Sequence, residues 1–476
     1  VIDMINTFTA KAIADGHGNR PIHLHKMDIS SAYSKLTFCA NDVHLMGCEL
    51  PGDLIAFFTG GTFGWGGMPF AFDVVTRAVQ WELNEGTQHR LHGMSLMYVD
   101  DVIGIAFADE VALDQAIITR LVEGLLGAGA ISVKKTMVEV EGVLEVIGYR
   151  IDRGMRRAGI SENNVHKAFQ AVWAIEHGPT NSRRMLQRVA SHASRYKRVC
   201  PLMAPFTRIL HGACKNHPHP QARFALTRKE WMAVWMMRIL LILSALDGCR
   251  FTRSFRSFAQ HLELVQWVLE YDACLTGVGM IWFRVVNGHE VAVGCCAVSL
   301  VALGFEQVGS GLMNTAEFIA ATLGVRGLIA QGVRDTGIKL RGDNKSALAW
   351  AHHKSFKSDY AMRAAIVHVA QNVKAGIEVV GTEHLPHTRE YDFNWRTDLA
   401  SRGTSWNRIR ELDGKDKVSG TRLGPEMVEW EIPGAEEVLR LCDPLSEQEG
   451  DEAFTRRVLE MRLPSGADGK GKGGVE

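Results

Sequence analysis

Apolar and polar positions in the first 150 residues follow the short periods of an α+β domain. Two apolar, β-prone runs at 96–99 and 102–106 flank a pair of adjacent acids, Asp100 and Asp101. This pattern predicts a β-hairpin whose tight turn carries both carboxylates. A glycine-rich stretch at 63–72 leads into a predicted helix that ends near residue 81.

The predicted secondary structure changes along the rest of the chain, from mainly helical to α/β and then to a polar tail. Residues 151–262 are predicted to be mainly helical, and the apolar run within them carries Arg238 at its middle, which favours a buried helix over a membrane span. From residue 263 strands and helices alternate, which predicts an α/β domain over 263–405. The last segment, 406–476, is acidic and Gly-rich, and we predict that it is disordered.

Composition is consistent with this division into domains. The chain has 476 residues, 46% of them hydrophobic and 22% charged, which fits two or three globular domains. The formal net charge is zero, but residues 151–262 hold 19 Lys and Arg against 5 Asp and Glu. This local surplus of 14 favours a track for a polyanion over the alternative of a solvated helix face.

Cysteine usage indicates an intracellular protein, in the cytoplasm, the nucleus or both. None of the nine cysteines forms a CxxC pair or a zinc-like spacing, so we predict free thiols in a reducing compartment. No signal peptide is visible, and no membrane contact is expected. The first residue is Val1, which suggests a fragment or an excised piece of a polyprotein.

Three acids in the first domain form a candidate metal site. Asp28 ends a predicted strand, and Asp100 and Asp101 share the hairpin turn. Like charges this close repel each other and need a compensating cation, and carboxylate oxygens suit Mg²⁺. For the pair alone, an ordinary acidic surface turn is the competing interpretation.

With its flanking sequence, this region resembles the palm of a reverse transcriptase. The resemblance rests on the YVDD sequence at 98–101, on HKMDISSAY at 25–33, on FGWGGMPFAF at 63–72 and on VKKT at 133–136, in that order. It covers about residues 20–150 and is greatest for LTR retroelements of the gypsy or DIRS type. Only 27 residues precede Asp28, so we expect this sequence to hold only part of the fingers of such an enzyme.

The resemblance implies roles for individual residues. Two Mg²⁺ or Mn²⁺ ions would be bridged by Asp28 and Asp100, with Asp101 beside them. Tyr33 matches the family's steric gate against a ribose 2′-OH, although a core aromatic is the simpler interpretation of a single tyrosine. Lys135, with Lys134 as its competitor, matches a lysine that assists pyrophosphate departure. The remaining nucleotide-binding candidates are Ile29, Ser31, Ala32 and Gly64.

The second α/β domain resembles ribonuclease H of the retroelement branch. Four acids lie at the ends of predicted elements in the order of that family, and the family's two-metal site would again use two Mg²⁺ or Mn²⁺ ions. His387 matches the family's mobile histidine, with His384 as the alternative and a surface-loop histidine as the simpler interpretation. The four acids are Asp272, Glu317, Asp343 and Asp398.

Together the two resemblances imply an RNA-directed DNA polymerase with ribonuclease H activity. Its partners would be an RNA template, a DNA primer, the RNA–DNA hybrid and dNTPs, and its oligomeric state is not predicted. The helical 151–262 segment would act as thumb and connection, with Arg195, Lys197 and Arg198 on phosphates. The alternatives are a truncated or host-retained copy that binds nucleic acid without turnover, and an RNA-templated RNA polymerase.

Overall fold

The computed structural model describes residues 1–178, 181–217, 219–221, 223–246, 252–255, 265–301, 312–352, 361–386, 394–413, 423–424, 426–442 and 451–464. The chain divides into two compact units, Val1–Ala158 and Gly159–Glu476, and both mix helices with strands. The predicted first boundary at residue 150 therefore lies eight residues before the boundary in the structure.

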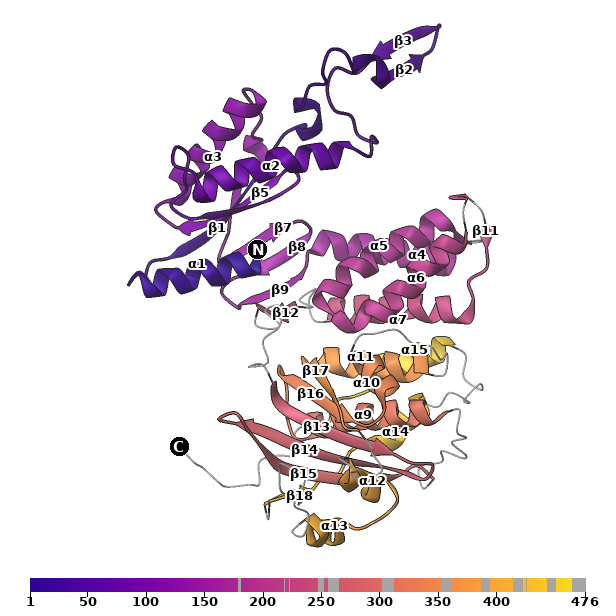
Figure 1. The fold of residues 1–476 in the computed structure, drawn as a ribbon. Helices are drawn as coiled ribbons and strands as arrows, with labels where there is room; N and C mark the ends of the chain where they lie inside the picture. Colours follow the sequence, from indigo (N-terminus) through magenta and orange to yellow (C-terminus); the bar gives the residue numbers. More distant parts are fainter. Residues whose placement is uncertain are drawn as a thin grey trace. The chain divides into compact units, whose positions relative to one another are not determined.

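The first unit is built on a four-stranded antiparallel sheet in the order β4-β5-β1-β6. Its strands are β1 (Ile22–Asp28), β4 (Met94–Tyr98), β5 (Asp101–Phe107) and β6 (Met137–Val138), and its helices are α1 (Ile2–Ala14), α2 (Met68–Glu85) and α3 (Val111–Leu126). The remaining elements are β2 (Gly47–Leu50), β3 (Leu54–Phe57), β7 (Val143–Val146), β8 (Tyr149–Asp152), η1 (Ala32–Lys35), η2 (Val43–Met46) and η3 (Val133–Lys135). The predicted acidic hairpin is present as β4 and β5. Figure 1 shows β1 and β5 together with α1, α2 and α3 in this unit.

Successive side chains of β1 point to opposite faces of the central sheet, and the two faces differ in character. Met27 lies opposite Val102 and joins the core with Phe72 and Ile118, which come from α2 and α3. Asp28 lies opposite Asp101, and residues directly opposite in a sheet share a face. Asp28 and Asp101 therefore lie on the face that is turned away from this core.

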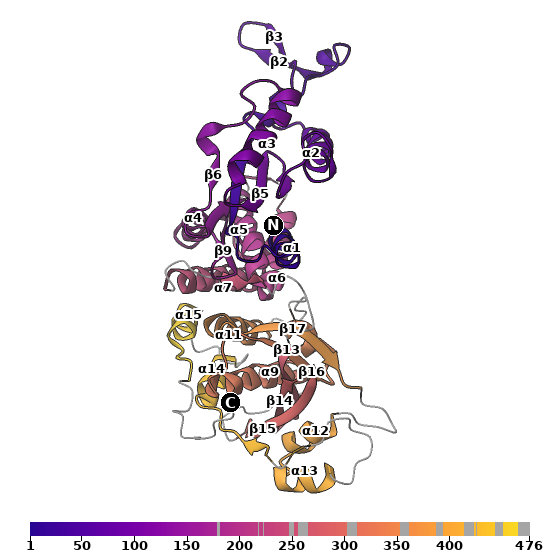
Figure 2. The ribbon, with the colours of Figure 1, turned by 90° about the vertical axis from the view of Figure 1, so that its left-hand side faces the viewer.

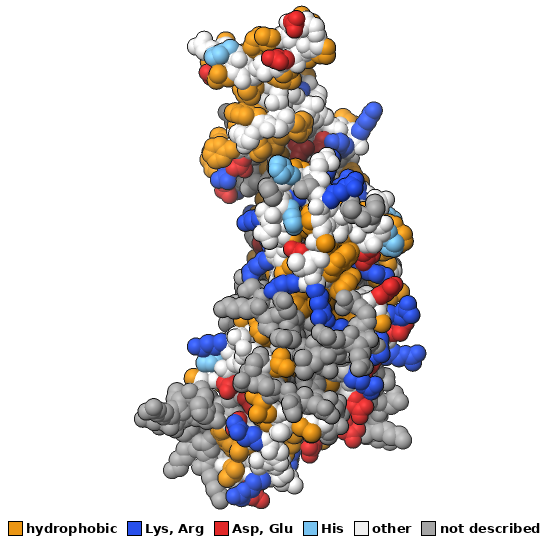
Figure 3. Space-filling model, turned by 90° about the vertical axis from the view of Figure 1, so that its right-hand side faces the viewer, with side chains coloured by type: hydrophobic (Ala, Val, Ile, Leu, Met, Phe, Trp, Pro, Cys, Tyr) orange, Lys and Arg blue, Asp and Glu red, His pale blue; other side chains and the backbone are white. Residues whose placement is uncertain are grey.

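The β2–β3 hairpin extends from the first unit and exposes apolar side chains. Leu54, Ile55 and Phe57 are each more than half exposed. Hydrophobic side chains gather over this hairpin in the space-filling view (Figure 3).

Of the segment 151–262 that was predicted to be mainly helical, residues 162–246 form a helical bundle, whereas Arg157–Ile160 and Thr252–Ser254 at its two ends are strands. It contains α4 (Glu162–His177), α5 (Arg183–Val199), η4 (Pro201–Met203), α6 (Ala204–Asn216) and α7 (Arg228–Leu246), with the short strands β10 (Asn181–Ser182) and β11 (Arg223–Phe224). Strand β9 (Arg157–Ile160) leads into the bundle. Apolar residues lie all around α7 because it contacts α4 and α6 as well as two later helices, α11 and α15. Among the described residues, no helix is long and apolar enough to cross a bilayer.

The α/β part of the second unit has a six-stranded sheet in the order β17-β16-β13-β14-β15-β18. Its strands are β13 (Val265–Ala273), β14 (Gly277–Val286), β15 (His289–Ser299), β16 (Gly337–Gly342), β17 (Glu378–His384) and β18 (Val428–Glu429). Its helices are α9 (Met313–Ala330), α10 (Lys345–Ala351), α11 (Ala361–Ala375), α12 (Trp395–Ser401), α13 (Trp406–Asp413), α14 (Ala435–Cys442) and α15 (Asp451–Glu460). Strand β12 (Thr252–Ser254) precedes the sheet in the sequence. Figure 2 places α9 and α12 on opposite sides of this sheet.

Close approach of α12 to the sheet depends on a glycine in β14. A Cβ at Gly279 would lie 2.4 Å from the carbonyl oxygen of Thr397, so any larger residue would push the helix away. Ala400 and Trp406 pack with Ile281 in the core on this side of the sheet. The glycine thus fixes the distance between the sheet and the helix that carries Asp398.

The structure corrects the prediction that 406–476 is a disordered tail. Strand β18 pairs with β15 as the sixth strand, and Trp430 stacks on Trp282 with ring centroids 4.6 Å apart. Helices α14 and α15 pack against α11, and the Lys374 ammonium donates to three carbonyl oxygens at the end of α15. The many charges in this segment hid the short apolar stripes that it buries, such as Val438, Leu439 and Phe454. Residues 465–476, which carry the Gly- and Lys-rich sequence, lie outside the described residues.

The eight described cysteines are free thiols, as predicted, and five of them are buried.

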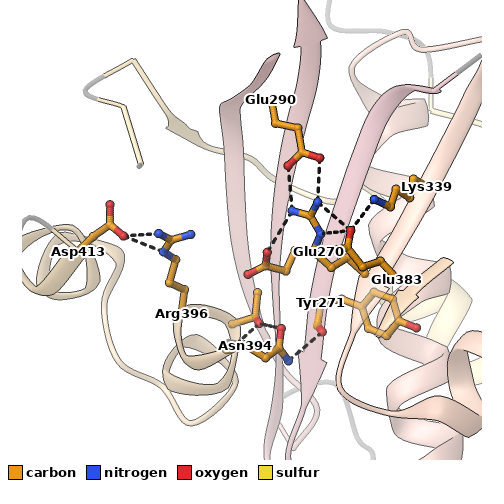
Figure 4. Close-up of polar contacts among 10 residues, drawn as sticks. Glu270, Tyr271, Glu290, Lys339, Glu383, Asn394, Arg396 and Asp413 are labelled. Carbon is orange, nitrogen blue, oxygen red and sulfur yellow. Dashed lines mark hydrogen bonds and ion pairs between the residues drawn. The ribbon is translucent and has the colours of Figure 1, made fainter. Parts of the chain in front are cut away.

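One arginine holds together the strands of the second sheet. Arg341 on β16 donates to both carboxylate oxygens of Glu290, at 2.8 and 2.9 Å, and to Glu383 at 3.1 Å. It also lies 3.9 Å from Glu270, a fully buried acid on β13 whose pKa is raised to about 7 by burial (Figure 4). Arg341 is therefore the charge that compensates three acids, with Lys339 assisting at Glu383.

We expect Arg341→Met to destabilise the second unit by about 3–5 kcal/mol, because it removes the cation nearest the buried Glu270 and the ion pair of the half-buried Glu290. Urea unfolding followed by tryptophan fluorescence measures this loss. Lys339→Met is the matched control, since Lys339 is the more exposed of the two cations and should cost about 1 kcal/mol or less. Equal losses for the two variants would contradict the assignment of Arg341 as the central cation.

Candidate functional sites

The first acidic cluster lies at the ends of β1 and β5. Asp28 is the last residue of β1 and pairs with Asp101, the first residue of β5. Asp100 lies in the turn between β4 and β5, where Val99 adopts a left-handed φ of 54°. The backbone N–H of Ile29 donates to the carbonyl oxygen of Asp100 at 2.8 Å, which ties the turn to the end of β1. The backbone thus brings the three predicted acids to one end of the sheet.

Two lysines neutralise part of this cluster. Lys135 on η3 donates to both carboxylate oxygens of Asp28 at 3.0 Å, and Lys26 on β1 lies 2.8 Å from Asp101. The pKa of Lys135 is raised above its usual value, mainly by the hydrogen bond to Asp28. Burial, followed by the charges of Asp101 and Asp28, raises the pKa of Asp100. Of the two competing lysines, Lys135 and not Lys134 therefore contacts the cluster.

The remaining predicted residues of this region lie along the chain that follows β1. Ile29 and Ala32 are buried, and Ser31 is exposed with a left-handed φ of 50°. Tyr33 is half-buried, and its ring centroid lies 5.2 Å from that of Phe63. Gly64 follows Phe63, is exposed and has a φ of 100°, which favours glycine.

The second acidic cluster lies at one end of the second sheet. Asp272 on β13, Glu317 on α9 and Asp343 after β16 offer carboxylate oxygens that all lie within 4.8 Å of one another. Asp272 and Glu317 are buried, and the Glu317 Oε2 atom has no hydrogen-bond partner among the described residues. These three residues could bind a metal ion, because an unsatisfied buried carboxylate oxygen beside two further acids suits a hard cation.

Electrostatics within this cluster also favour a cation. Burial, followed by the charges of Asp343 and Asp398, raises the pKa of Asp272 to about 8. Burial and the charges of Asp272 and Asp343 raise the pKa of Glu317 well above its usual range. A divalent cation would remove the repulsion that causes part of both shifts.

Asp398, the fourth predicted acid, is held somewhat apart from the other three. It lies on α12 and accepts a hydrogen bond from Arg402 Nε at 2.8 Å, one helical turn further on. Its charge reaches Asp272, as the raised pKa of that residue indicates. His384 Nε2 lies 2.9 Å from the carbonyl oxygen of Asp343, whereas His387 lies outside the described residues.

Two further residues hold Asp272 in place, and the sequence analysis missed both. Asn394 Nδ2 donates to Asp272 Oδ1 at 3.0 Å. It also donates to the carbonyl oxygen of Tyr271 at 3.3 Å (Figure 4). Ser401 Oγ donates to Asp272 Oδ2 at 3.0 Å. Asn394 and Ser401 lie four residues before and three residues after Asp398, so helical spacing could have placed all three on one face.

The raised pKa values predict that metal binding releases protons. Burial and the neighbouring acids raise the pKa of Asp272 to about 8, so a cation that binds this carboxylate near neutral pH competes with a proton. We expect Mn²⁺ affinity to rise about tenfold per pH unit between pH 6 and 8, if one proton is released. Calorimetry in two buffers of different ionisation enthalpy counts the protons. Asp343→Asn is the control, and a release of no protons by the unsubstituted chain would contradict the assignment.

The raised pKa values of Asp272 and Glu317 also determine whether the free energy of unfolding rises or falls with pH. A carboxyl group whose pKa is raised by folding makes the folded protein bind more protons than the unfolded chain, so its stabilising contribution is lost as pH rises from about 4 to 8. A bound cation offsets that loss. The increase in melting temperature on adding Mg²⁺ should therefore be larger at pH 8 than at pH 6.

The basic residues of α5 fall on two sides of that helix. Arg195 and Arg198 continue a stripe that begins with Arg184 and Arg188, because spacings of 4, 7 and 3 residues return to one helical face. Lys197, which the sequence analysis also assigned to phosphates, lies on another side of the helix by the same rule. The charges of Arg195, Lys167 and Arg188 contribute, after burial, to a lowered pKa at His192, so Lys167 on α4 adjoins the stripe.

Comparison with known proteins gives similarity to solved structures only. No family model and no curated protein sequence matches the chain. A foamy viral protease–reverse transcriptase in complex with an RNA/DNA hybrid has a TM-score of 0.35 and 13% identity, covering 76% of this chain and 44% of that chain. The same foamy viral protein in complex with double-stranded DNA, in a form described as dRH, has a TM-score of 0.35 and 12% identity, covering 78% and 58%. A further double-stranded DNA complex has a TM-score of 0.35 and 12% identity, covering 77% and 68%. This chain thus spans less than half of the first structure's length.

Proposed function

We propose that the chain is an RNA-directed DNA polymerase with ribonuclease H activity, derived from a retrotransposon. The first unit would be the polymerase palm with partial fingers, the helical bundle the thumb and connection, and the α/β part the ribonuclease H domain. The observation that carries the proposal is that one chain holds two separate carboxylate clusters, each at the end of a sheet. The motif order described for both regions agrees with this assignment.

In the first cluster, Asp28 and Asp100 would hold two Mg²⁺ or Mn²⁺ ions, with Asp101 beside them. Bound there, the ions would activate the primer 3′-hydroxyl and neutralise the triphosphate. Lys135 contacts both carboxylate oxygens of Asp28. This supports a cation-binding role for Asp28, because a divalent metal ion could replace the ammonium group at the same two oxygens.

Residues after β1 would bind the incoming dNTP. The backbone from Ile29 to Ala32 would reach the triphosphate, Gly64 would admit the incoming base, and Lys135 would assist pyrophosphate departure. Tyr33 would act as the steric gate, and its contact with Phe63 places the ring next to the glycine-rich loop, which supports this role.

In the second cluster, Asp272, Glu317, Asp343 and Asp398 would hold two ions that bracket a phosphate of the RNA strand and orient a water. Asn394 and Ser401 would keep both oxygens of Asp272 in place. His387 would protonate the leaving group or assist product release, and His384 is the alternative. The Asp343 contact of His384 supports a positioning role for that residue.

The basic stripe on α5, in which Arg195 is half-buried and the other three arginines are exposed, would bind the phosphates of a duplex. If about four to six cations contact phosphates, hybrid affinity should fall with salt with a log–log slope of about −4 to −5. Neutralising Arg188, Arg195 and Arg198 together should make the slope shallower by up to about three units. Fluorescence anisotropy from 50 to 300 mM salt measures it.

Lys197→Gln, which lies off the stripe, is the matched control and should change the slope by less than about one unit. Because phosphate contacts carry no sequence information, the triple variant should lose affinity equally for unrelated sequences. An unchanged slope in the triple variant would mean that the stripe faces solvent and not the duplex.

Primer extension tests the polymerase assignment. With a DNA primer on an RNA template, the chain should extend the primer in Mg²⁺ with dNTPs and far less with rNTPs. Extension with rNTPs alone would indicate an RNA-templated RNA polymerase. Tight binding of the hybrid without any extension or cleavage would indicate a truncated or host-retained binding protein.

A further inference from the structure

Lys26 lies on the same face of the first sheet as the acids. It precedes Asp28 by two residues on β1, and because Asp28 is opposite Asp101, it is the diagonal neighbour of Asp101 on β5. Its Nζ atom lies 2.8 Å from Asp101 Oδ1. Lys26 and Asp28 lie on the same strand, so the pairing of β1 with β5 fixes the position of both residues relative to Asp101.

The two lysines of this cluster differ in how firmly they are held. The side chain of Lys135 is 65% exposed and takes both oxygens of Asp28, so solvent competes for this contact. The side chains of Lys26 and Asp101 are only 19% and 14% exposed. A cation that arrives from solvent can therefore replace Lys135 at Asp28 more easily than Lys26 at Asp101.

We propose that Lys26 is a positioning residue that holds Asp101 against β1 and away from the metal ions bound by Asp28 and Asp100. This role rests on the proposed polymerase function. Lys26 keeps one Asp101 oxygen engaged and supplies one positive charge to a cluster of three carboxylates. Without Lys26, Asp101 is free to turn toward the ions and to bind them in an unproductive arrangement.

The proposal predicts opposite effects on binding and on rate. Lys26→Met removes a positive charge near the ions and frees a third carboxylate, so Mn²⁺ affinity should rise about three- to tenfold. Primer extension at saturating Mg²⁺ should fall about ten- to a hundredfold, because misplaced ligands lower the rate of the chemical step. Lys26→Arg retains the charge and should stay within about threefold of the unsubstituted chain in both measurements.

The experiment uses the full chain with Asp343→Asn in every variant, which removes one carboxylate of the second cluster. Free Mn²⁺ is counted by electron paramagnetic resonance, and Asp28→Asn gives the background that does not come from the first cluster. Lys134→Met is the matched control, because Lys134 is an exposed neighbour of Lys135, and it should change neither measurement.

Tighter Mn²⁺ binding with slower extension in Lys26→Met, restored in Lys26→Arg, supports the proposal. Weaker or unchanged Mn²⁺ binding in Lys26→Met overturns it, because a merely structural lysine would lower affinity and rate together. Unchanged extension also overturns it. If the unsubstituted first site extends no primer, the proposed polymerase function fails, and the Mn²⁺ affinities of Lys26→Met and Lys26→Arg then decide the role of Lys26.

Discussion

We expect Asp100→Asn to abolish primer extension while the same chain still cuts the RNA strand of a hybrid. Asp100 lies at the centre of the first cluster, and burial and the charges of Asp28 and Asp101 raise its pKa. Loss of one metal ligand removes transition-state stabilisation and should slow nucleotidyl transfer about a thousandfold or more. Asn keeps the shape of the side chain, and the carbonyl oxygen of Asp100 still accepts from Ile29.

Extension of a labelled primer on an RNA template measures the loss, and cleavage of a labelled hybrid by the same preparation measures the second activity. Asp53→Asn is the matched control, because Asp53 lies in an exposed turn with a φ of 56°, a conformation that Asn tolerates. Extension by Asp100→Asn within tenfold of the unsubstituted chain would contradict the assignment of the first cluster.

Asp343→Asn should have the reverse effect, with hybrid cleavage lost and primer extension kept. Asp343 belongs to the carboxylate triad with Asp272 and Glu317, and we expect a loss of about a thousandfold or more in cleavage rate. Its charge raises the pKa of both other acids, so neutralising it should also raise the melting temperature of the metal-free chain. A substitution that stabilises the protein but abolishes activity is typical of a charged residue that is needed for function and destabilises the fold.

Cleavage of a hybrid labelled on its RNA strand measures this rate, and differential scanning fluorimetry without metal measures the stability. Glu429→Gln, an exposed acid on β18, is the matched control and should leave both unchanged. An Asp343→Asn chain that cuts the hybrid at a normal rate in Mg²⁺ would show that Asp343 is not a ligand.

The spacing of apolar residues and the polar residues of the turns were enough to predict the helices and strands that carry the acids. The hairpin of β4 and β5 followed from two β-prone runs around Asp100 and Asp101, and α9 lies in the region where strands and helices were expected to alternate. These elements are long or strongly patterned, so local sequence determines them. The expected strand end at Asp28 also agrees with β1.

Contacts made by long side chains could not be predicted in the same way. The ion pairs of Lys26 and Lys135 join residues that are 75 and 107 positions from their partners, and the reach of a lysine depends on the sheet register. Asn394 approaches Asp272 only because Gly279 admits α12 to the sheet, which is a tertiary effect. Strand β18 has two residues, too few for any period, and its place in the sheet depends on Trp430 packing on Trp282.

The central claim is that one chain makes DNA on RNA and then removes the RNA at a separate site. The most direct test is a single time course with an RNA template and a DNA primer that carry different fluorescent labels, in Mg²⁺ and dNTPs. The account predicts that primer extension precedes RNA fragmentation, that Asp100→Asn stops extension while pre-formed hybrid is still cut, and that Asp343→Asn gives full-length DNA on intact RNA. A chain that leaves both labels unchanged while it binds the duplex would contradict the account.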